Sequence, residues 1–312
     1  MTHSTRNLLD RQIGYAALIS AVAFLVAGGT PVAVGQQVSG TGWRPFPVFD
    51  ATLYRSKPSL AVTGLLPIAG VYAGQFGETW YKDPAQLPPK STVQEAAQAA
   101  LGKASLAFLD IEHWPQKGTA ATVADSVSKY VAVAQWFREA APGLPFGYYG
   151  APPVPDYWRA IAPSTGADYT SWISDNDRLR PIADTVDILF PSLYTFYDDR
   201  DGWRRQAIAQ IAEARRYGAG KPVYVFLWPQ YHDSNPSLAW AYLPADFWKL
   251  ELDTARQYAD GIVIWGGWSA AGTPVEWDEH ASWWMITKAF LSDLRTSSRL
   301  PSKLTPPSLV VQ

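Results

Sequence analysis

The chain contains no cysteine among its 312 residues. This absence excludes disulfides, thiolate nucleophiles, cysteine–zinc sites and lipid attachment through cysteine. Histidine is scarce as well, with four residues scattered along the chain and no pair at the spacing of a zinc-binding helix. The sequence therefore gives no reason to expect a metal centre built on histidine.

An excess of charge of one sign is also missing, because the formal net charge is −2. A chain so close to neutral gives no reason to expect nucleic acid or an anionic membrane surface as a partner. Aromatic residues, in contrast, are abundant, and fifteen of them are tryptophans. Flat aromatic rings suit the apolar faces of sugars, although packing in a large core accounts for most of them.

The N-terminal segment, residues 1–35, has the pattern of a secretory signal peptide. Arg6 and Arg11 precede an uncharged, mainly apolar run at 13–29, and small residues follow at 33–35. The run is long for a signal peptide and short for a membrane span, so an uncleaved N-terminal anchor is the alternative. We expect a secreted or periplasmic protein, which contacts a membrane only if this segment is retained.

Beyond this segment, short apolar runs alternate with amphipathic stretches of helical periodicity. The apolar runs have the length and composition of buried strands, and helical patterns lie between several of them. Alternation of this kind, with nearly all-apolar strands, indicates a parallel sheet covered by helices. The predicted strands are 46–50, 67–72, 106–112, 144–149, 187–194, 222–227 and 261–266.

Seven predicted strands over roughly 250 residues favour a closed barrel over an open sheet. A glycine-rich dinucleotide fingerprint, which would favour the open sheet, does not follow the first strand. The fold class predicted for residues 44–296 is therefore α/β, a TIM-like (β/α) barrel that is distorted and has seven strands. Residues 297–312, rich in serine and proline, are expected to form a disordered tail.

Chemically active side chains gather at the ends of the predicted strands, where the active site of such a barrel forms. The third strand ends in Asp110 and Glu112, and positions i and i+2 of a strand share one face. Two like charges side by side after a buried strand are costly, which favours a reaction centre over two surface acids. Other strands end in Tyr72, Tyr149, Tyr194 and Trp265.

A pair of carboxylates in a mouth lined with aromatic rings indicates glycoside hydrolysis. One acid protonates the leaving oxygen, while a second group stabilises or attacks the anomeric carbon. A neighbouring carboxylate raises the pKa of the acid member, as a general acid near neutral pH requires. The alternatives are a non-catalytic carbohydrate-binding or cell-envelope protein on the same barrel, and a glycosidase with a protein nucleophile.

Five motifs follow one another in a recognisable order and spacing. They are VYAGQFG at 71–77, LDIEHW at 109–114, FGYYG at 146–150 with PDYW at 155–158, DNDRLRP at 175–181 before FPSLY at 190–194, and GIVIWGGW at 261–268. In this order they resemble the hyaluronidases of animals and venoms, glycoside hydrolase family 56. The order and spacing agree across roughly residues 44–296, and the resemblance implies a distorted barrel of seven strands.

The resemblance also implies a role for each carboxylate. Glu112 would act first as the acid and then as the base. Asp110 would hold the N-acetyl group of the substrate, whose carbonyl oxygen attacks the anomeric carbon in place of a protein nucleophile. The enzyme would cleave a polysaccharide that contains N-acetylhexosamine, within the chain and with retention of configuration.

Further roles are implied for the aromatic residues at the other strand ends. Tyr149 and Tyr194 would position or polarise the acetamido group, Trp265 would pack against its methyl group, and Tyr72 would line the cleft. The resemblance implies neither a metal nor an organic cofactor. If the substrate were the polyanion hyaluronan, local positive charge would have to come from residues such as Arg159, Arg178 and Arg180.

Other side chains near the strand ends suit structural roles. Asp50, at the end of the first strand, is expected to anchor a loop. His113 points away from Glu112 and is expected to be structural. Stacking on sugars and packing in the core are both open for Trp80, Trp172, Trp228 and Trp268.

Overall fold

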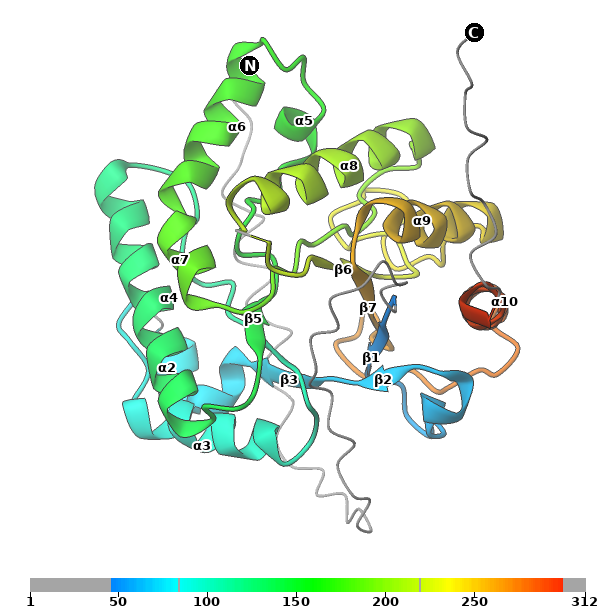
Figure 1. Ribbon diagram of the computed structural model, residues 1–312, viewed down its shortest axis with the longest axis horizontal. Helices are drawn as coiled ribbons and strands as arrows, with labels where there is room; N and C mark the ends of the chain where they lie inside the picture. The colour runs from blue at the N-terminus through cyan, green and yellow to red at the C-terminus, as the bar shows by residue number, and fades with distance from the viewer. Residues whose placement is uncertain (1–45, 84, 219, 300–312) are drawn as a thin grey trace, which may run out of the picture.

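The computed structural model of the chain describes residues 46–83, 85–218 and 220–299. The predicted signal peptide at 1–35 lies outside this range, as does most of the tail predicted at 297–312. Strands run through the middle of the molecule and helices surround them (Figure 1). None of the helices in the described part of the chain is long and apolar enough to cross a membrane.

Parallel strands form the centre of the fold. Their apolar side chains occur either in continuous runs or at alternate positions. The strands are β1 (Val48–Thr52), β2 (Leu66–Pro67), β3 (Ala69–Tyr72), β4 (Ala107–Asp110), β5 (Phe146–Tyr148), β6 (Tyr224–Leu227) and β7 (Gly261–Gly266). They pair in the order β2-β1-β7-β6 and in the order β3-β4-β5. Every pair of neighbouring strands is parallel, as the apolar character of the strands predicts.

These two sheets join into one closed barrel. β2 and β3 are consecutive parts of a single predicted strand, which is interrupted at Ile68, so the sheets are continuous there. On the other side, the segment 187–195 lies between β5 and β6, and isolated bridges such as Tyr149–Phe190 and Ser192–Phe226 join it to both. The predicted α/β barrel with seven strand segments is thus confirmed.

The fifth predicted strand, 187–194, differs from the prediction because it is not a continuous strand. Its backbone makes separate bridges, and Phe226 donates a hydrogen bond to the carbonyl oxygen of Pro191 at 2.9 Å. Pro191 has no N–H group to donate in return, which explains why the ladder is interrupted here. This interruption is one of the distortions of the barrel.

Helices cover the outside of the barrel, with α3, α4 and α7 on one side and α8 and α9 on another (Figure 1). Each long amphipathic pattern of the sequence forms a helix, and α10 continues three residues into the predicted tail. The bounds are η1 (Leu60–Thr63), η2 (Ala73–Phe76), α2 (Glu78–Lys82), α3 (Lys90–Leu101), α4 (Ala120–Ala140), α5 (Tyr157–Ala160), α6 (Ala167–Arg178), α7 (Arg180–Thr185), α8 (Arg200–Tyr217), α9 (Ala245–Tyr258) and α10 (Ser282–Arg299).

The interior of the barrel is filled by a cluster of buried side chains that is rich in phenylalanine. The cluster includes Phe49, Leu106, Phe108, Phe190, Phe226 and Val263. Because side chains alternate along a strand, the residue two positions after each of these points into the same space, one layer nearer the C-terminal end. The apolar cluster therefore fills the lower layers of the barrel, and side chains such as Asp110 and Trp265 lie in the next layer, nearer the C-terminal ends of the strands.

Candidate active site

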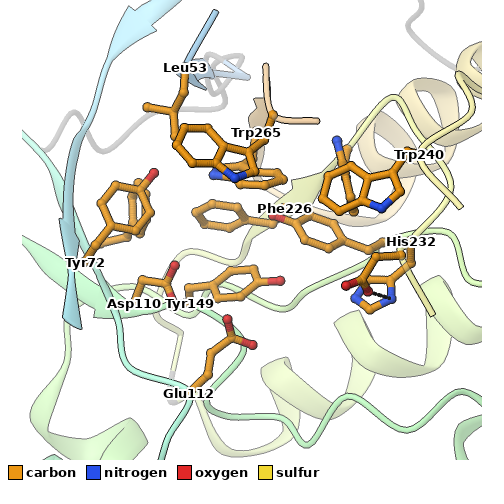
Figure 2. A pocket seen from close by; sticks show the side chains of 14 residues that line it. Leu53, Tyr72, Asp110, Glu112, Tyr149, Phe226, His232, Trp240 and Trp265 are labelled. Carbon is orange, nitrogen blue, oxygen red and sulfur yellow. Dashed lines mark ion pairs between the residues drawn. The ribbon is translucent and has the colours of Figure 1, made fainter. Parts of the chain in front are cut away.

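A pocket that is open to solvent lies at the C-terminal ends of the strands. The structure brings all six predicted site residues into its wall, from β3, from β4 and the loop that follows it, from the end of β5, from the segment 187–195, and from β7. All of them except Tyr194 are labelled in Figure 2. These residues are Tyr72, Asp110, Glu112, Tyr149, Tyr194 and Trp265.

The backbone between the two carboxylates is held firmly. Asp110 ends β4, and Ile111, which separates it from Glu112, is buried with 1% of its surface exposed. The carbonyl oxygen of Ile111 accepts a hydrogen bond from the hydroxyl of Tyr130 on α4 at 2.8 Å. The carbonyl oxygen of Tyr130 in turn accepts one from the hydroxyl of Tyr148 on β5 at 2.7 Å. This chain of hydrogen bonds fixes the direction of both carboxylates relative to the barrel.

Both carboxyl groups point toward Tyr149 and the interior of the pocket (Figure 2). Burial raises the pKa of Asp110 well above its usual value, and the adjacent Glu112 carboxylate raises it further. Glu112 is open to the pocket, but the surrounding wall removes much of its hydration and raises its pKa as well. His232 lowers the pKa of Glu112 and Asp233 raises it. The pair thus keeps a proton to higher pH than two solvated carboxylates would.

Two tyrosine hydroxyls stand beside the carboxylates. The hydroxyl of Tyr149 lies 3.0 Å from Oγ of Ser192, which orients it. The rings of Tyr149 and Tyr194 are 5.6 Å apart, and Tyr194 stacks on Trp265 with 5.9 Å between ring centroids. Burial raises the pKa of both hydroxyls well above the usual value, so they stay protonated and act as hydrogen-bond donors.

Three further residues of the wall follow β6; the sequence left Trp228 open between stacking and packing, and sequence reasoning missed His232 and Asp233. Trp228 comes directly after the strand, and His232 and Asp233 lie in the same loop with Nδ1 and Oδ1 3.0 Å apart. The rule that active sites form at strand ends applies to β6 as to the other strands. Applied to this strand, the same rule would have found these residues.

Trp240 also lines the pocket, and nothing in the sequence indicates it. Its φ of +68° lies in the left-handed region, which is costly for a residue with a bulky side chain. The amide of Gln230 donates to the carbonyl oxygen of Trp240 at 2.6 Å, and the side-chain oxygen of Gln230 accepts from the indole of Trp228 at 3.0 Å. Strained backbone of this kind occurs at functional sites. Here the strained conformation places Trp240 against Trp228, with 5.2 Å between the ring centroids.

The side chains expected to be structural are so placed. Asp50 accepts hydrogen bonds from Thr52 and pairs with Lys57 at 2.7 Å, which anchors the loop after β1. His113 packs against the rings of Trp80 and Tyr81, at 5.6 and 5.1 Å. Of the four tryptophans left open, Trp80 and Trp172 are buried in the main core, whereas Trp228 and Trp268 line the pocket.

Of the three arginines expected to supply positive charge, Arg180 is exposed, whereas Arg159 and Arg178 are already paired. Arg159 contacts Asp175 at 2.7 Å and Asp156 at 2.9 Å, and Arg178 also pairs with Asp175. The charges of Arg159 and Arg178 are therefore neutralised by neighbouring carboxylates. In the part of the chain that the structure describes, no three histidine, cysteine, aspartate or glutamate side chains are grouped so that they could hold a metal ion.

Comparison with known proteins gives a match at the level of structure. No protein-family model matches the chain, and a comparison with curated protein sequences finds no match. Among solved structures, bee venom hyaluronidase superposes with a TM-score of 0.53 over 80% of this chain and 96% of that chain, at 14% identity. The fold is a distorted TIM barrel.

Two further structures are similar to the chain. Bee venom hyaluronidase in complex with a hyaluronic acid tetramer gives a TM-score of 0.51 at 15% identity, covering 80% of this chain and 95% of that chain. The endo-beta-1,4-mannanase from Thermotoga petrophila gives 0.48 at 13% identity, covering 77% of this chain and 60% of that chain. At such identities the likeness to the hyaluronidase concerns the fold, and the chemistry has to be argued from the pocket itself.

Proposed function

We propose that the protein is a glycosidase of the hyaluronidase type, an endo-β-N-acetylhexosaminidase that retains configuration through participation of the substrate. The observation that carries this proposal is the carboxylate pair, Asp110 and Glu112, in an aromatic pocket at the C-terminal ends of the strands. Both carboxyl groups have a raised pKa, and Glu112 is open to the pocket. The barrel fold shared with bee venom hyaluronidase is consistent with this function.

In the first step, the sugar that carries the N-acetyl group occupies the pocket. The carbonyl oxygen of its acetamido group attacks the anomeric carbon from the face opposite the leaving oxygen, and the bond to the leaving oxygen breaks. Glu112 donates its proton to that oxygen. The positive charge that develops on this group favours the charged form of Asp110, which holds the acetamido N–H and stabilises that charge.

In the second step, water attacks the anomeric carbon and the bond to the acetamido oxygen breaks. Glu112, now a carboxylate, takes the proton of this water and returns to its starting state. Each step inverts the configuration at the anomeric carbon, so the product retains the configuration of the substrate. The protein supplies acid, base and positioning, and the nucleophile belongs to the substrate.

The aromatic side chains position the reacting sugar in this proposal. Tyr149 and Tyr194 donate hydrogen bonds to the acetamido oxygen, because their raised pKa values keep both hydroxyls protonated. Trp265, which stacks on Tyr194, packs against the acetamido methyl group. Tyr72 closes the side of the pocket next to Phe108, with 5.7 Å between the ring centroids.

The decisive experiment compares acetylated glycans with their de-N-acetylated counterparts. Hyaluronan, chondroitin and a neutral N-acetylglucosamine polymer are incubated with the protein, and new reducing ends are counted. Proton NMR in the first minutes reads the configuration of the product. We expect cleavage of an acetylated polymer with retention, and no cleavage of its deacetylated form.

Two results would contradict the proposal in different ways. An inverted product, or equal rates on acetylated and deacetylated glycans, would exclude acetamido participation while leaving a glycosidase. Binding of glycans without any new reducing end would instead favour the carbohydrate-binding alternative.

A further inference from the structure

A pair of exposed aromatic rings lies on the surface of the barrel. Trp158 has 62% of its surface exposed and Tyr197 has 36%, although tryptophan is usually well buried. Their ring centroids are 5.2 Å apart, and the indole N–H of Trp158 donates to the hydroxyl of Tyr197 at 3.2 Å. A tryptophan that is held open by a hydrogen bond offers one flat apolar face to a ligand.

A continuous line of rings connects this pair to the pocket. His232 lines the pocket, and the ring of Phe196 lies 4.5 Å from it. Phe196 lies 6.4 Å from Tyr197, which in turn contacts Trp158. Exposure increases along this line, from half-buried Phe196 to exposed Trp158. We call Phe196, Tyr197 and Trp158 the aromatic ridge.

The aromatic ridge is held in place by its neighbours. Tyr157 packs edge-on against Tyr197 at 5.0 Å, and its hydroxyl donates to Asp199 at 2.9 Å. Asp156 accepts from the backbone N–H of Arg159 at 3.2 Å and so caps α5, which carries Trp158. A surface that is ordered before the ligand arrives loses little conformational entropy on binding.

The aromatic ridge shares one rim of the barrel with the pocket. Trp158 lies on α5, which follows β5, and Tyr197 follows the segment 187–195, so both lie beyond C-terminal ends of strand segments. We propose that the aromatic ridge is a distal subsite for an oligosaccharide chain whose reacting sugar occupies the pocket. This inference rests on the proposed function and adds a binding site to it.

The carboxylates along this path favour an uncharged chain over an acidic one. Asp110, Glu112 and Asp233 line the pocket, with Asp233 paired to His232, and the exposed Asp199 follows Asp198, which pairs with Arg200 at 3.0 Å. Carboxylates on the sugar units would meet carboxylates of the protein, and such like-charge contacts disfavour a partner. Stacking of sugar faces on rings carries no such penalty. The ligand class is therefore a neutral N-acetylated glycan rather than one with uronic acids.

The test measures binding of N-acetylglucosamine trimers and hexamers to the full chain carrying Glu112→Gln, which prevents turnover. In this parent the hexamer should bind about tenfold more tightly than the trimer, as burial of one further aromatic face predicts. Adding Trp158→Ala should reduce this ratio toward one, and Trp158→Phe should restore part of it. Hyaluronan hexasaccharide should bind more weakly than the neutral hexamer.

A matched control removes an exposed apolar side chain elsewhere. Leu101, with 49% of its surface exposed, ends α3 before β4 begins, at the opposite end of the barrel. Leu101→Ala should keep the tenfold ratio of the parent. A ratio that survives Trp158→Ala in a protein of normal melting temperature would overturn the proposal, and so would tighter binding of hyaluronan.

A third outcome assigns the aromatic ridge to a protein contact instead. If Trp158→Ala changes the sedimentation coefficient but not the ratio, the exposed rings mediate self-association and the distal subsite is wrong. Failure of the proposed function has a separate signature, because it appears as absence of hydrolysis by the wild-type protein on every glycan of the panel.

Discussion

Glu112 combines two properties that rarely occur in one carboxyl group, exposure to a pocket and a raised pKa. The surrounding wall causes the raised pKa, and the charges of His232 and Asp233 adjust it in opposite directions. Asp110 has less access to solvent, and its own pKa is raised by burial and by Glu112. At the scale of single residues, the proposed chemistry therefore depends on how Asp110 and Glu112 share one proton.

Glu112→Gln should abolish hydrolysis without unfolding the protein. Glutamine keeps the size of the side chain but can neither donate the proton nor take it back, and losing a general acid lowers the rate by roughly 10²–10⁴-fold. The measurement is kcat/KM on the glycan that the wild type cleaves, with melting temperature as a check on folding. Glu95→Gln on the exposed face of α3 is the matched control. Wild-type turnover in Glu112→Gln would exclude this residue as the acid.

His232→Gln should move the alkaline limb of the pH–rate profile to higher pH. His232 lowers the pKa of Glu112, and it also pairs with Asp233, which raises that pKa. Without the histidine, nothing at this position lowers the pKa of Glu112, and Asp233 still raises it. Glu112 therefore keeps its proton to higher pH. kcat/KM measured from pH 4 to pH 9 reads the limb. The exposed His280→Gln should leave the profile in place, and a limb that moves to lower pH would contradict the assignment.

At the scale of elements, the barrel depends on close approach between β5 and the segment 187–195. A Cβ atom at Gly147 would lie 2.1 Å from the carbonyl oxygen of Ile188 and 2.9 Å from the ring of Phe190. Real contacts are longer, so any side chain here would push the two segments apart. Glycine is required at this position because of space, not because of its backbone angles.

Gly147→Ala should therefore destabilise the protein by on the order of 1–3 kcal/mol, or more if the backbone cannot move. Urea unfolding measures the change in the free energy of unfolding. Gly143→Ala, just before β5, has nothing within 4 Å of the added Cβ and serves as the control. Equal stability of the two variants would show that β5 and the segment 187–195 can separate freely.

Helix α9 meets the barrel through a buried acid. The hydroxyl of Thr195 donates to Oε1 of Glu251, while Oε2 has no hydrogen-bond partner among the described residues. Burial raises the pKa of Glu251 well above its usual value, and the hydrogen bond from Thr195 lowers it only in part. The folded chain thus keeps Glu251 protonated at a pH where the unfolded chain has released that proton.

Glu251→Gln should stabilise the protein relative to wild type increasingly as pH rises. Above pH ~4.3, the ordinary pKa of glutamate, the unfolded wild type binds fewer protons than the folded one, so its stability falls by up to about 1.4 kcal/mol per pH unit. Glutamine cannot ionise and avoids this loss. The difference in melting temperature between variant and wild type should therefore grow as pH rises above ~4.3, until the folded protein itself releases the proton. A constant difference would mean that Glu251 is ionised in the folded protein.

At the scale of the whole molecule, the barrel brings side chains from most of the chain to one rim. The pocket takes Leu53 from the loop after β1 and Trp268 from the loop after β7, on either side of the seam where these strands pair. Two hydrophobic clusters, one inside the barrel and one between barrel and helices, hold the fold without any disulfide. Addition of a reducing agent is therefore not expected to affect it.

Export of the whole chain is a prediction from residues 1–35. Expressed with this segment in a bacterial host, the protein should appear in the periplasm or the medium, with an N-terminus near residue 36 by mass spectrometry. An arginine in place of Leu18, within the apolar run, should retain the full-length chain in the cytoplasm. Full-length wild type in the membrane fraction would instead identify an uncleaved anchor, and soluble full-length protein in the cytoplasm would contradict export.

Much of the site was determined by the sequence itself, because the period of side chains along a strand is a local property. In the segment 106–112 an apolar run is followed by two carboxylates one residue apart. This spacing places Asp110 and Glu112 on one face at a strand end, whatever surrounds them. Repetition of such runs between helical patterns determines a parallel, helix-covered sheet. The same strand-end rule selected Tyr149, Tyr194 and Trp265, and the structure brings them together.

Only the tertiary structure decided how the segments approach one another. It divides the predicted second strand at Ile68 into β2, which pairs with β1, and β3, which pairs with β4. In place of a continuous strand at 187–194, it has separate β-bridges. It turns Trp240 into the pocket through a strained loop, pairs Arg159 with Asp175, and joins Trp158 to Tyr197. These contacts link residues far apart in the chain. A local sequence pattern indicates which face of a strand or helix a residue occupies, but it does not indicate which distant residue that side chain will contact.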